Sequence, residues 1–218
     1  SAGFLRRMVV HLVMEGGGVL GIALAGYTYC LEQVGIRFLG VAGTSAGAIN
    51  ALLVAASDTP DKEKSDTVID EIANVPLSSF VDGNFFAKSI VYIFQWKIHW
   101  LPKIILGIFP TLFELPVFLS KLGLNPGHKF LMWVVKALET ANIKSLSDLE
   151  KRMQIPKEVK LRESRKEVGD ERPISTGFAV MAADLTTRTK VEFPRMSKLY
   201  WTKPSTVNPG AFVRASMS

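Results

Sequence analysis

The N-terminal part of the chain alternates short β-branched runs with longer apolar segments at helical spacing. Residues 8–14, MVVHLVM, predict a strand buried on both faces of a parallel sheet. Residues 19–34 carry apolar and aromatic side chains at helical spacing, and Gly35 follows as a C-cap. A second apolar run, residues 38–42, leads into another apolar helix over about residues 46–56. This order predicts a β-α-β unit that places both loops at the same carboxyl edge of a parallel sheet.

The apolar spacing further along the chain predicts two helices and then two strands. Residues 127–141 form an amphipathic pattern, and residues 145–153, SLSDLEKRM, begin a helix with Ser145 as its cap. Residues 174–183 predict a strand, and residues 190–193 a short partner after a turn. The whole pattern predicts an α/β fold.

A segment from about residue 85 to residue 122 is apolar and aromatic, but prolines and charged residues interrupt it. It therefore holds no clean apolar run long enough for a membrane-spanning helix. Two interpretations remain: a buried cap on the domain, and an amphipathic lid that contacts a bilayer. Trp96 and Trp100, with lysines nearby, are residue types that membrane interfaces favour, although aromatic side chains also fill ordinary cores.

Residues 15–21, EGGGVLG, form a glycine loop after the first strand and contain the pattern G-x-G-x-x-G. Such a loop binds a dinucleotide pyrophosphate or donates N–H groups to an oxyanion. A dinucleotide fold carries an acidic residue at the end of its second strand, whereas RFLGVAG has none and Glu32 lies inside the preceding helix. The oxyanion interpretation is therefore favoured. Its candidate N–H donors are Gly16, Gly17, Gly18 and Ala46.

Residues 43–47, GTSAG, match the nucleophile motif G-x-S-x-G between a predicted strand and a predicted helix. The sharp turn needs small neighbours, which Gly43, Thr44 and Gly47 supply around the serine. Ser45 is the candidate nucleophile, and the helix N-terminus would stabilise negative charge that develops beside it. The alternative is a serine that only caps the helix.

The composition indicates the size and class of the protein but does not indicate which reaction it catalyses. The chain has 218 residues, 48% of them hydrophobic and 21% charged, which suits one globular domain. The single cysteine, Cys30, excludes an internal disulfide, and no secretory leader opens the sequence, so a cytoplasmic location is expected. The net charge of +6 suits an anionic partner such as nucleic acid or acidic lipid, or simply a basic surface.

EGGGVLGIALAG and GVAGTSAGAINAL together resemble the patatin-like phospholipases, which are related in catalytic architecture to cytosolic phospholipase A2. The resemblance continues through later segments to FVRASMS, residues 212–218, but does not include about residues 60–121. It implies a three-layer α/β/α fold with a mostly parallel central sheet over residues 1–218. It also implies a lipid acyl hydrolase of the phospholipase A or lysophospholipase type. Such an enzyme uses a Ser-Asp dyad without metal or cofactor, acts on phospholipid or another lipid ester, and binds no nucleic acid.

The aspartate of the dyad is where this sequence departs from the family. It lies in an Asp-Gly-Gly or Asp-Gly-Ala turn downstream of the segment that FVRASMS resembles, so we expect it beyond Ser218 and missing from the 218 residues. Asp82 precedes a glycine but falls in the wrong chain order. Asp184 resembles a position that the family uses structurally near the site, and it is not assigned as the base.

Two other classes of function stay open. A Ser-His-Asp esterase would need a histidine after Ser45, where only His99 and His128 occur, neither at a strand end. A catalytically inactive lipid-binding or nucleotide-binding α/β module would explain a missing aspartate. Peripheral contact with a membrane and the need for a protein activator are further open points.

Overall fold

The computed structural model describes residues 8–18, 21–75, 127–155, 157, 159–160 and 176–217. The chain divides into two compact units, residues 1–74 with 134–218 and residues 75–133. The predicted cap or lid, about residues 85–122 with His99, lies outside the described residues, as does Asp82. The two interpretations of that segment therefore stay predictions. Within the described ranges, no helix combines the length and apolar character needed to cross a membrane.

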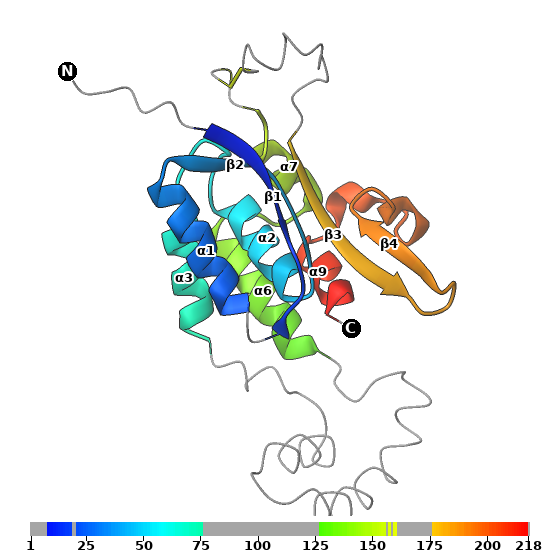
Figure 1. The fold of residues 1–218 in the computed structure, drawn as a ribbon. Coiled ribbons are helices and arrows are strands. Elements are labelled where there is room, and N and C mark those ends of the chain that lie inside the picture. The colour runs from blue at the N-terminus through cyan, green and yellow to red at the C-terminus, as the bar shows by residue number, and fades with distance from the viewer. Residues whose placement is uncertain are drawn as a thin grey trace, which may run out of the picture. The chain divides into compact units, whose positions relative to one another are not determined.

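The first unit is built on a sheet in which the described strands have the order β1-β2-β3-β4 (Figure 1). These strands are β1 (Met8–Met14), β2 (Ile36–Thr44), β3 (Gly177–Asp184) and β4 (Thr189–Phe193). The first three are parallel, and β4 runs antiparallel to β3. The predicted β-α-β unit and the α/β fold class with a mostly parallel sheet are confirmed. The register pairs Met14 with Gly43 and Thr44 with Met181, so the ends of β1 and β2 meet beside β3.

The described helices follow the predicted order, with additions. They are α1 (Gly21–Gln33), α2 (Ala46–Ser57), α3 (Ser65–Ala73), α6 (His128–Thr140), α7 (Leu146–Arg152), α9 (Gly210–Ser216) and the 3-10 turns η3 (Ser197–Leu199) and η4 (Pro204–Thr206). Ser145 caps α7 as predicted: its Oγ accepts the Asp148 N–H at 3.3 Å, while the Asp148 carboxylate accepts the Ser145 N–H at 3.0 Å. The sequence analysis did not predict α3, η3, η4 or α9.

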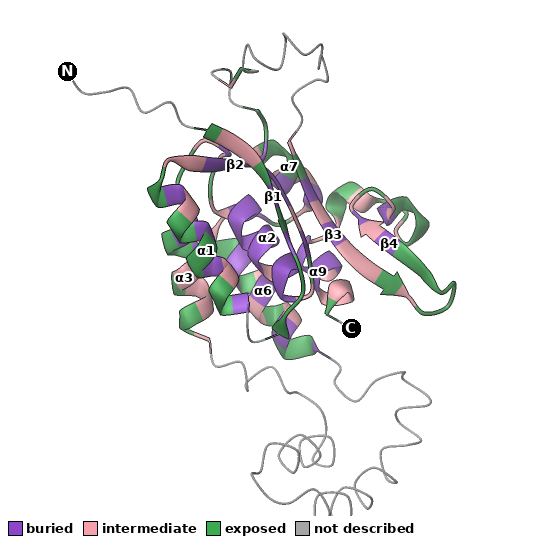
Figure 2. Ribbon diagram, in the orientation of Figure 1, coloured by how far each residue is buried: buried purple, intermediate pink, exposed green. Residues whose placement is uncertain are grey.

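Helix α2 forms the centre of the core. Ten of its 12 residues are buried, and in Figure 2 it is almost entirely purple. Its many alanines let it lie close to β1, β2 and β3 while it also contacts α1, α3 and α9. Burying a side chain such as Leu52 contributes about 1.5–3 kcal/mol. The N-terminus of α2 is therefore held firmly at the carboxyl edge of the sheet.

Strand β1 is buried on one face only, so the prediction of two buried faces was wrong for this strand. Leu12 and Met14 are buried, whereas His11 is exposed and Val13 is 78% exposed. Among the described elements, α2 packs on β1, and the buried Leu12 and Met14 alternate with the exposed His11 and Val13. His11 is a sheet-face residue: its ring occupies the space where a Cβ on Gly40 of β2 would lie. The inner strand β2 does show the continuous burial expected for a parallel sheet.

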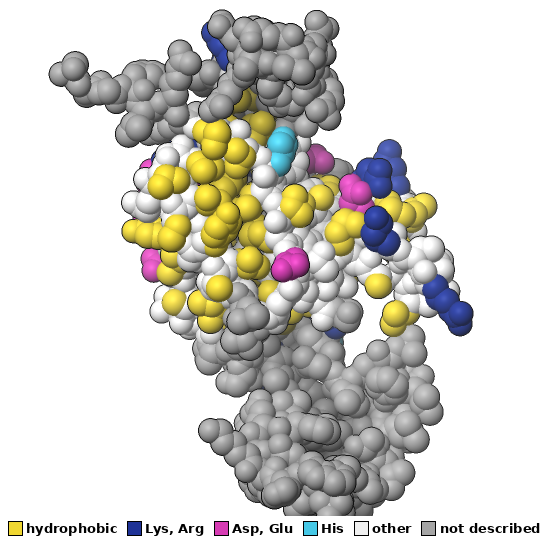
Figure 3. Space-filling view, viewed as in Figure 1, with side chains coloured by type: hydrophobic (Ala, Val, Ile, Leu, Met, Phe, Trp, Pro, Cys, Tyr) yellow, Lys and Arg dark blue, Asp and Glu magenta, His cyan; other side chains and the backbone are white. Residues whose placement is uncertain are grey.

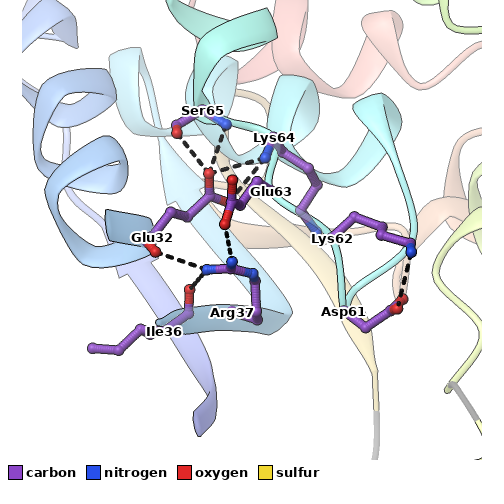
Figure 4. Close-up of polar contacts among 8 residues, drawn as sticks. All are labelled: Glu32, Ile36, Arg37, Asp61, Lys62, Glu63, Lys64 and Ser65. Carbon is purple, nitrogen blue, oxygen red and sulfur yellow. Dashed lines mark hydrogen bonds and ion pairs between the residues drawn. The ribbon is translucent and has the colours of Figure 1, made fainter. Parts of the chain in front are cut away.

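Glu32, which the dinucleotide interpretation would need, is instead part of a buried structural network (Figure 4). Its carboxylate accepts the N–H of Lys64 at 2.9 Å, and the N–H and hydroxyl of Ser65 at 2.8 and 2.6 Å. These contacts satisfy N–H groups at the start of α3. Arg37 donates to the Glu32 carbonyl oxygen at 2.8 Å and pairs with Glu63. Glu32 therefore joins α1, β2 and α3 and has no free carboxylate for a ribose.

The side chain of Lys64 is buried beside this network. Burial lowers its pKa to about 8, although the carboxylates of Glu32, Asp58 and Asp61 act in the opposite direction. Its Nζ donates to the carbonyl oxygen of Thr59 at 3.3 Å. The lowered pKa means that folding disfavours the charged form of this amine.

Replacing Lys64 should alter how stability depends on pH. The pKa of Lys64 is about 8 in the folded protein and 10.5 as its ordinary value. Between these two pH values the unfolded chain binds more protons at Lys64, so the contribution of this residue to the free energy of unfolding increases as the pH rises. Lys64→Met should lose this gain. We would compare urea unfolding at pH of about 7 and about 9.5 by circular dichroism.

The matched control is Lys62→Met, because the Lys62 side chain is 57% exposed. It should keep the wild-type difference between the two pH values. A Lys64→Met protein with that same difference would contradict the assignment.

Candidate active site

Ser45 lies at the junction of β2 and α2 with φ 52° and ψ −120°. Residues other than glycine rarely adopt a positive φ, and such a conformation costs about 1–3 kcal/mol unless the surroundings impose it. The Ser45 side chain makes no capping hydrogen bond to α2, which argues against a serine that serves only as a helix cap. Its Oγ lies 3.6 Å from Sδ of Met217. The backbone thus holds the hydroxyl away from the helix that follows it.

Gly43 and Gly47 flank Ser45, and backbone atoms of other residues lie so close to both that a side chain would not fit. A Cβ on Gly43 would overlap the carbonyl of Gly47 and lie 2.6 Å from the Ala48 nitrogen. A Cβ on Gly47 would overlap the carbonyl group of Met14 and lie 2.7 Å from the Glu15 carbonyl oxygen. The steric need inferred from G-x-S-x-G therefore has identified partners, namely the start of α2 and the end of β1.

The glycine loop lies directly against the serine turn. A Cβ on Gly16 would be 3.2 Å from Cβ of Ser45 and 3.9 Å from its Oγ. Gly18 has φ 55°, a left-handed conformation that glycine adopts freely. Among the described residues, the N–H groups of Gly16 and Gly17 donate to no backbone acceptor. The loop thus places Gly16, whose N–H has no backbone acceptor in the described part of the chain, next to the Ser45 side chain.

Asn50 joins the starts of α1 and α2, and the sequence analysis missed it. Its Nδ2 donates to the carbonyl oxygens of Gly21 and Ala46 at 3.0 and 3.2 Å, and the residue is 1% exposed. A Cβ on Gly21 would lie only 2.9 Å from that of Ala46, so the two helices meet closely here. The available signal was a single amide within an otherwise apolar helix, AINALLVAA.

Ser216 of α9 is a second residue that sequence reasoning missed. Its Oγ accepts the Ser45 N–H at 2.8 Å and donates to the carbonyl oxygen of Met181 at 2.6 Å. One hydroxyl therefore connects the strained turn to β3 across a long sequence separation. The available signal was the segment FVRASMS, which the sequence analysis compared with the family without assigning a role to Ser216.

A groove of about 700 Å³ opens beside the serine turn. Thr44, Ser216 and the 181–184 part of β3 line it near the turn, and the β3–β4 hairpin lines the remainder. Asp184 lies in its wall and accepts hydrogen bonds from the Tyr200 hydroxyl at 2.7 Å and from the N–H groups of Thr186 and Thr187. The Tyr200 hydrogen bond is the main cause that lowers the pKa of Asp184, and the same bond raises the pKa of Tyr200. Asp184 is therefore ionised and engaged in holding the hairpin.

The structure brings most of the predicted site residues together. Gly16, Gly43, Ser45, Ala46 and Gly47 converge at the carboxyl edge of the sheet, next to Thr44 and Gly21. Gly17 and Gly18 follow Gly16 in the chain, and nothing lies within 4 Å of a Cβ added at Gly18. The roles assigned to these residues stay predictions, as does the dyad aspartate expected beyond Ser218. His128, considered for an esterase, is exposed at the start of α6.

Gly47→Ala should strongly destabilise the first unit, because the added methyl group has no room against the carbonyl groups of Met14 and Glu15. We expect a loss of about 1–3 kcal/mol or more in the free energy of unfolding, measured by urea denaturation. Gly26→Ala in α1 is the control, since nothing lies within 4 Å of its added Cβ. That variant should be unchanged or more stable by about 0.5–1 kcal/mol. Equal stability of the two variants would contradict the packing described.

Comparisons with known proteins identify chains that are similar to this one. YqhO of Bacillus subtilis (strain 168), described as an uncharacterized protein, is 32% identical over 145 residues, which span 66% of this chain and 41% of YqhO. The solved structure of VipD from Legionella pneumophila aligns over 94% of this chain and 41% of VipD, with a TM-score of 0.42 and 16% identity. ExoU in the ExoU–SpcU complex of Pseudomonas aeruginosa aligns over 98% of this chain and 36% of the neighbour, with a TM-score of 0.40 and 19% identity. The family model for patatin-like phospholipases matches residues 12–197. This match covers both glycine motifs, and the chain therefore belongs to the patatin-like phospholipase family.

Proposed function

We propose that this chain carries the nucleophile of a lipid acyl hydrolase of the phospholipase A or lysophospholipase type. The observation that carries the proposal is the strained Ser45, at φ 52°, with the Gly16 Cβ position 3.9 Å from its hydroxyl. Strain of this kind is retained where the surroundings over-determine the backbone, and it gathers at active sites. Membership of the patatin-like phospholipase family supports a lipid ester as the substrate.

In the proposed reaction, Ser45 Oγ attacks the ester carbonyl carbon while a carboxylate accepts the hydroxyl proton. The carboxylate would be the dyad aspartate expected beyond Ser218. The developing oxyanion would accept hydrogen bonds from the loop N–H groups of Gly16, Gly17 and Gly18 and from Ala46 at the start of α2. The alcohol leaves, an acyl-enzyme remains, and water then releases the fatty acid by the reverse proton transfer.

The surroundings of Ser45 fit this chemistry better than the alternatives do. The groove has apolar side chains along β3, including Met181 and Ala182, which suits part of a lipid. A dinucleotide would need a free acidic residue near the second strand, but Glu32 is buried and fully engaged with α3. The histidine-dependent esterase has only the exposed His128 among the described candidates. A lipid-binding module without catalysis would release no fatty acid, whereas the proposed enzyme would release it through Ser45.

Ser45→Ala should abolish fatty-acid release from phospholipid vesicles, measured by mass spectrometry with a polypeptide extended past Ser218. The variant removes the attacking oxygen without changing the backbone of the turn. Ser57→Ala is the matched control, because Ser57 lies at the other end of α2 and its hydroxyl donates to the Leu53 carbonyl oxygen. It should release fatty acid at the wild-type rate. Undiminished release by Ser45→Ala, or no release by folded wild-type protein, would refute the proposal.

Gly17→Pro tests the proposed oxyanion hole. Proline removes the Gly17 N–H, and loss of one such donor typically lowers turnover by about 10²–10³-fold. Gly17→Ala keeps the donor, and Gly17 is not among the positive-φ glycines, so its backbone conformation is open to alanine. We therefore expect Gly17→Ala to retain most activity and Gly17→Pro to lose nearly all of it, with unchanged circular dichroism. Wild-type turnover by Gly17→Pro would remove Gly17 from the site.

A further inference from the structure

The groove extends from Thr44 and Ser216 to the tip of the β3–β4 hairpin. Ser45 itself does not line it, but Ser45 follows Thr44 in the chain and its N–H donates to the Ser216 hydroxyl. At one end, Thr44 pairs with Met181, whose carbonyl oxygen accepts the Ser216 hydroxyl. At the other end lie Leu185, Arg188 and Lys190. Met181 and Asp184 are three residues apart along β3, which corresponds to about 10 Å at the usual rise of a strand. A ligand whose reactive group reaches Ser45 can therefore extend a second group to the hairpin.

The hairpin end of the groove carries two unpaired cations. Arg188 and Lys190 are both exposed, and among the described residues neither has a carboxylate partner within ion-pair distance. In Figure 3, the dark blue side chains gather on the right side, where Figure 1 places β4 and the hairpin. Exposed cations are ordinary on a basic surface, but these two line the same cavity as the serine turn.

The turn of the hairpin has a backbone fixed by local hydrogen bonds. Arg188 has φ 55°, a left-handed conformation that non-glycine residues rarely adopt. Just before it, Asp184 accepts the N–H groups of Thr186 at 2.8 Å and Thr187 at 3.1 Å. The other carboxylate oxygen of Asp184 accepts the Tyr200 hydroxyl. Asp184 is the one carboxylate among the described lining residues, and both of its oxygens accept hydrogen bonds.

The composition of the groove matches an amphiphile with a negative group. Met181, Ala182, Ala183 and Leu185 give it an apolar wall, and Leu185 is 70% exposed. The guanidinium of Arg188 presents planar paired donors, the geometry that suits phosphate, and the ammonium of Lys190 adds a second positive charge. The net charge of +6 would also draw an anionic ligand toward the protein.

We propose that this groove selects anionic phospholipids, with the lipid phosphate bound by Arg188 and Lys190 while the ester lies at Ser45. This inference rests on the proposed function, because it assigns the substrate class of the same site. Zwitterionic lipids carry the same phosphate but offset it with a head-group cation, which these two side chains repel. The proposed ligand is a lipid phosphate and not free phosphate, because only a lipid has an apolar part that can contact the apolar wall.

The test uses the Ser45→Ala protein, so that binding is measured without hydrolysis, and short-chain monomeric lipids, so that adsorption to a charged surface plays no role. Isothermal titration should show tighter binding of a short-chain phosphatidic acid than of the matching phosphatidylcholine. Arg188→Gln with Lys190→Gln should weaken binding of the phosphatidic acid by about tenfold or more, as expected for loss of charge-assisted hydrogen bonds. Inorganic phosphate and glycerol phosphate should bind far more weakly than the lipid.

Lys198→Gln with Lys203→Gln is the matched control, because both lysines are exposed and lie outside the groove lining. This double substitution lowers the net charge by the same amount as the groove variant does. It should leave the affinity for phosphatidic acid unchanged. Equal weakening by both double variants, or none by the groove variant, would overturn the proposal. Free phosphate binding as tightly as the lipid would also overturn it, since the site would then recognise the anion alone.

Fatty-acid release by the active protein separates this inference from the proposed function. Selective binding of phosphatidic acid without any hydrolysis would refute the enzyme and support the groove assignment. Hydrolysis whose preference for anionic over zwitterionic lipid is unchanged by the groove variant would support the enzyme and refute the groove assignment.

Discussion

At the carboxyl edge of the sheet, the first turn of α2 lies so close to the ends of β1 and β2 that only glycine fits at Gly43 and Gly47. The rest of the candidate site depends on this approach. Within this arrangement Ser45 has a positive φ and Gly16 lies against its side chain. The burial of α2 against three strands supplies ample free energy to offset strain of about 1–3 kcal/mol.

Polar contacts complete what close packing begins. Asn50 connects the two helix starts, and Ser216 connects the Ser45 N–H to β3, so the strained turn is bonded to elements on both sides. Ser216 engages the Ser45 N–H, so the oxyanion donors of the proposed reaction would come from other N–H groups. Asp184 has a comparable role further from the serine, where it fixes the hairpin that forms the far end of the groove.

The sequence predicted the features that depend on local patterns. The β-branched run of β1, the apolar helix α2 and the G-x-S-x-G turn each carry their signal within a few residues, and the Ser145 cap does so as well. Contacts across long separations were not predictable: Ser45 and Ser216 are 171 residues apart, and Glu32 binds Ser65 from 33 residues away. The seven-residue helix α9 has too little periodicity to recognise, and the burial of β1 was overestimated because an edge position cannot be read from one strand.

The proposed chemistry requires that the fold activates one serine out of the many in this chain. Reaction of the full-length protein with a fluorophosphonate, followed by peptide mapping to find the modified residue, tests this requirement directly. We expect a single adduct on Ser45, which is absent when the protein is unfolded before the reaction. An adduct on a different serine, or equal modification of several serines, would contradict the assignment of Ser45 as the nucleophile.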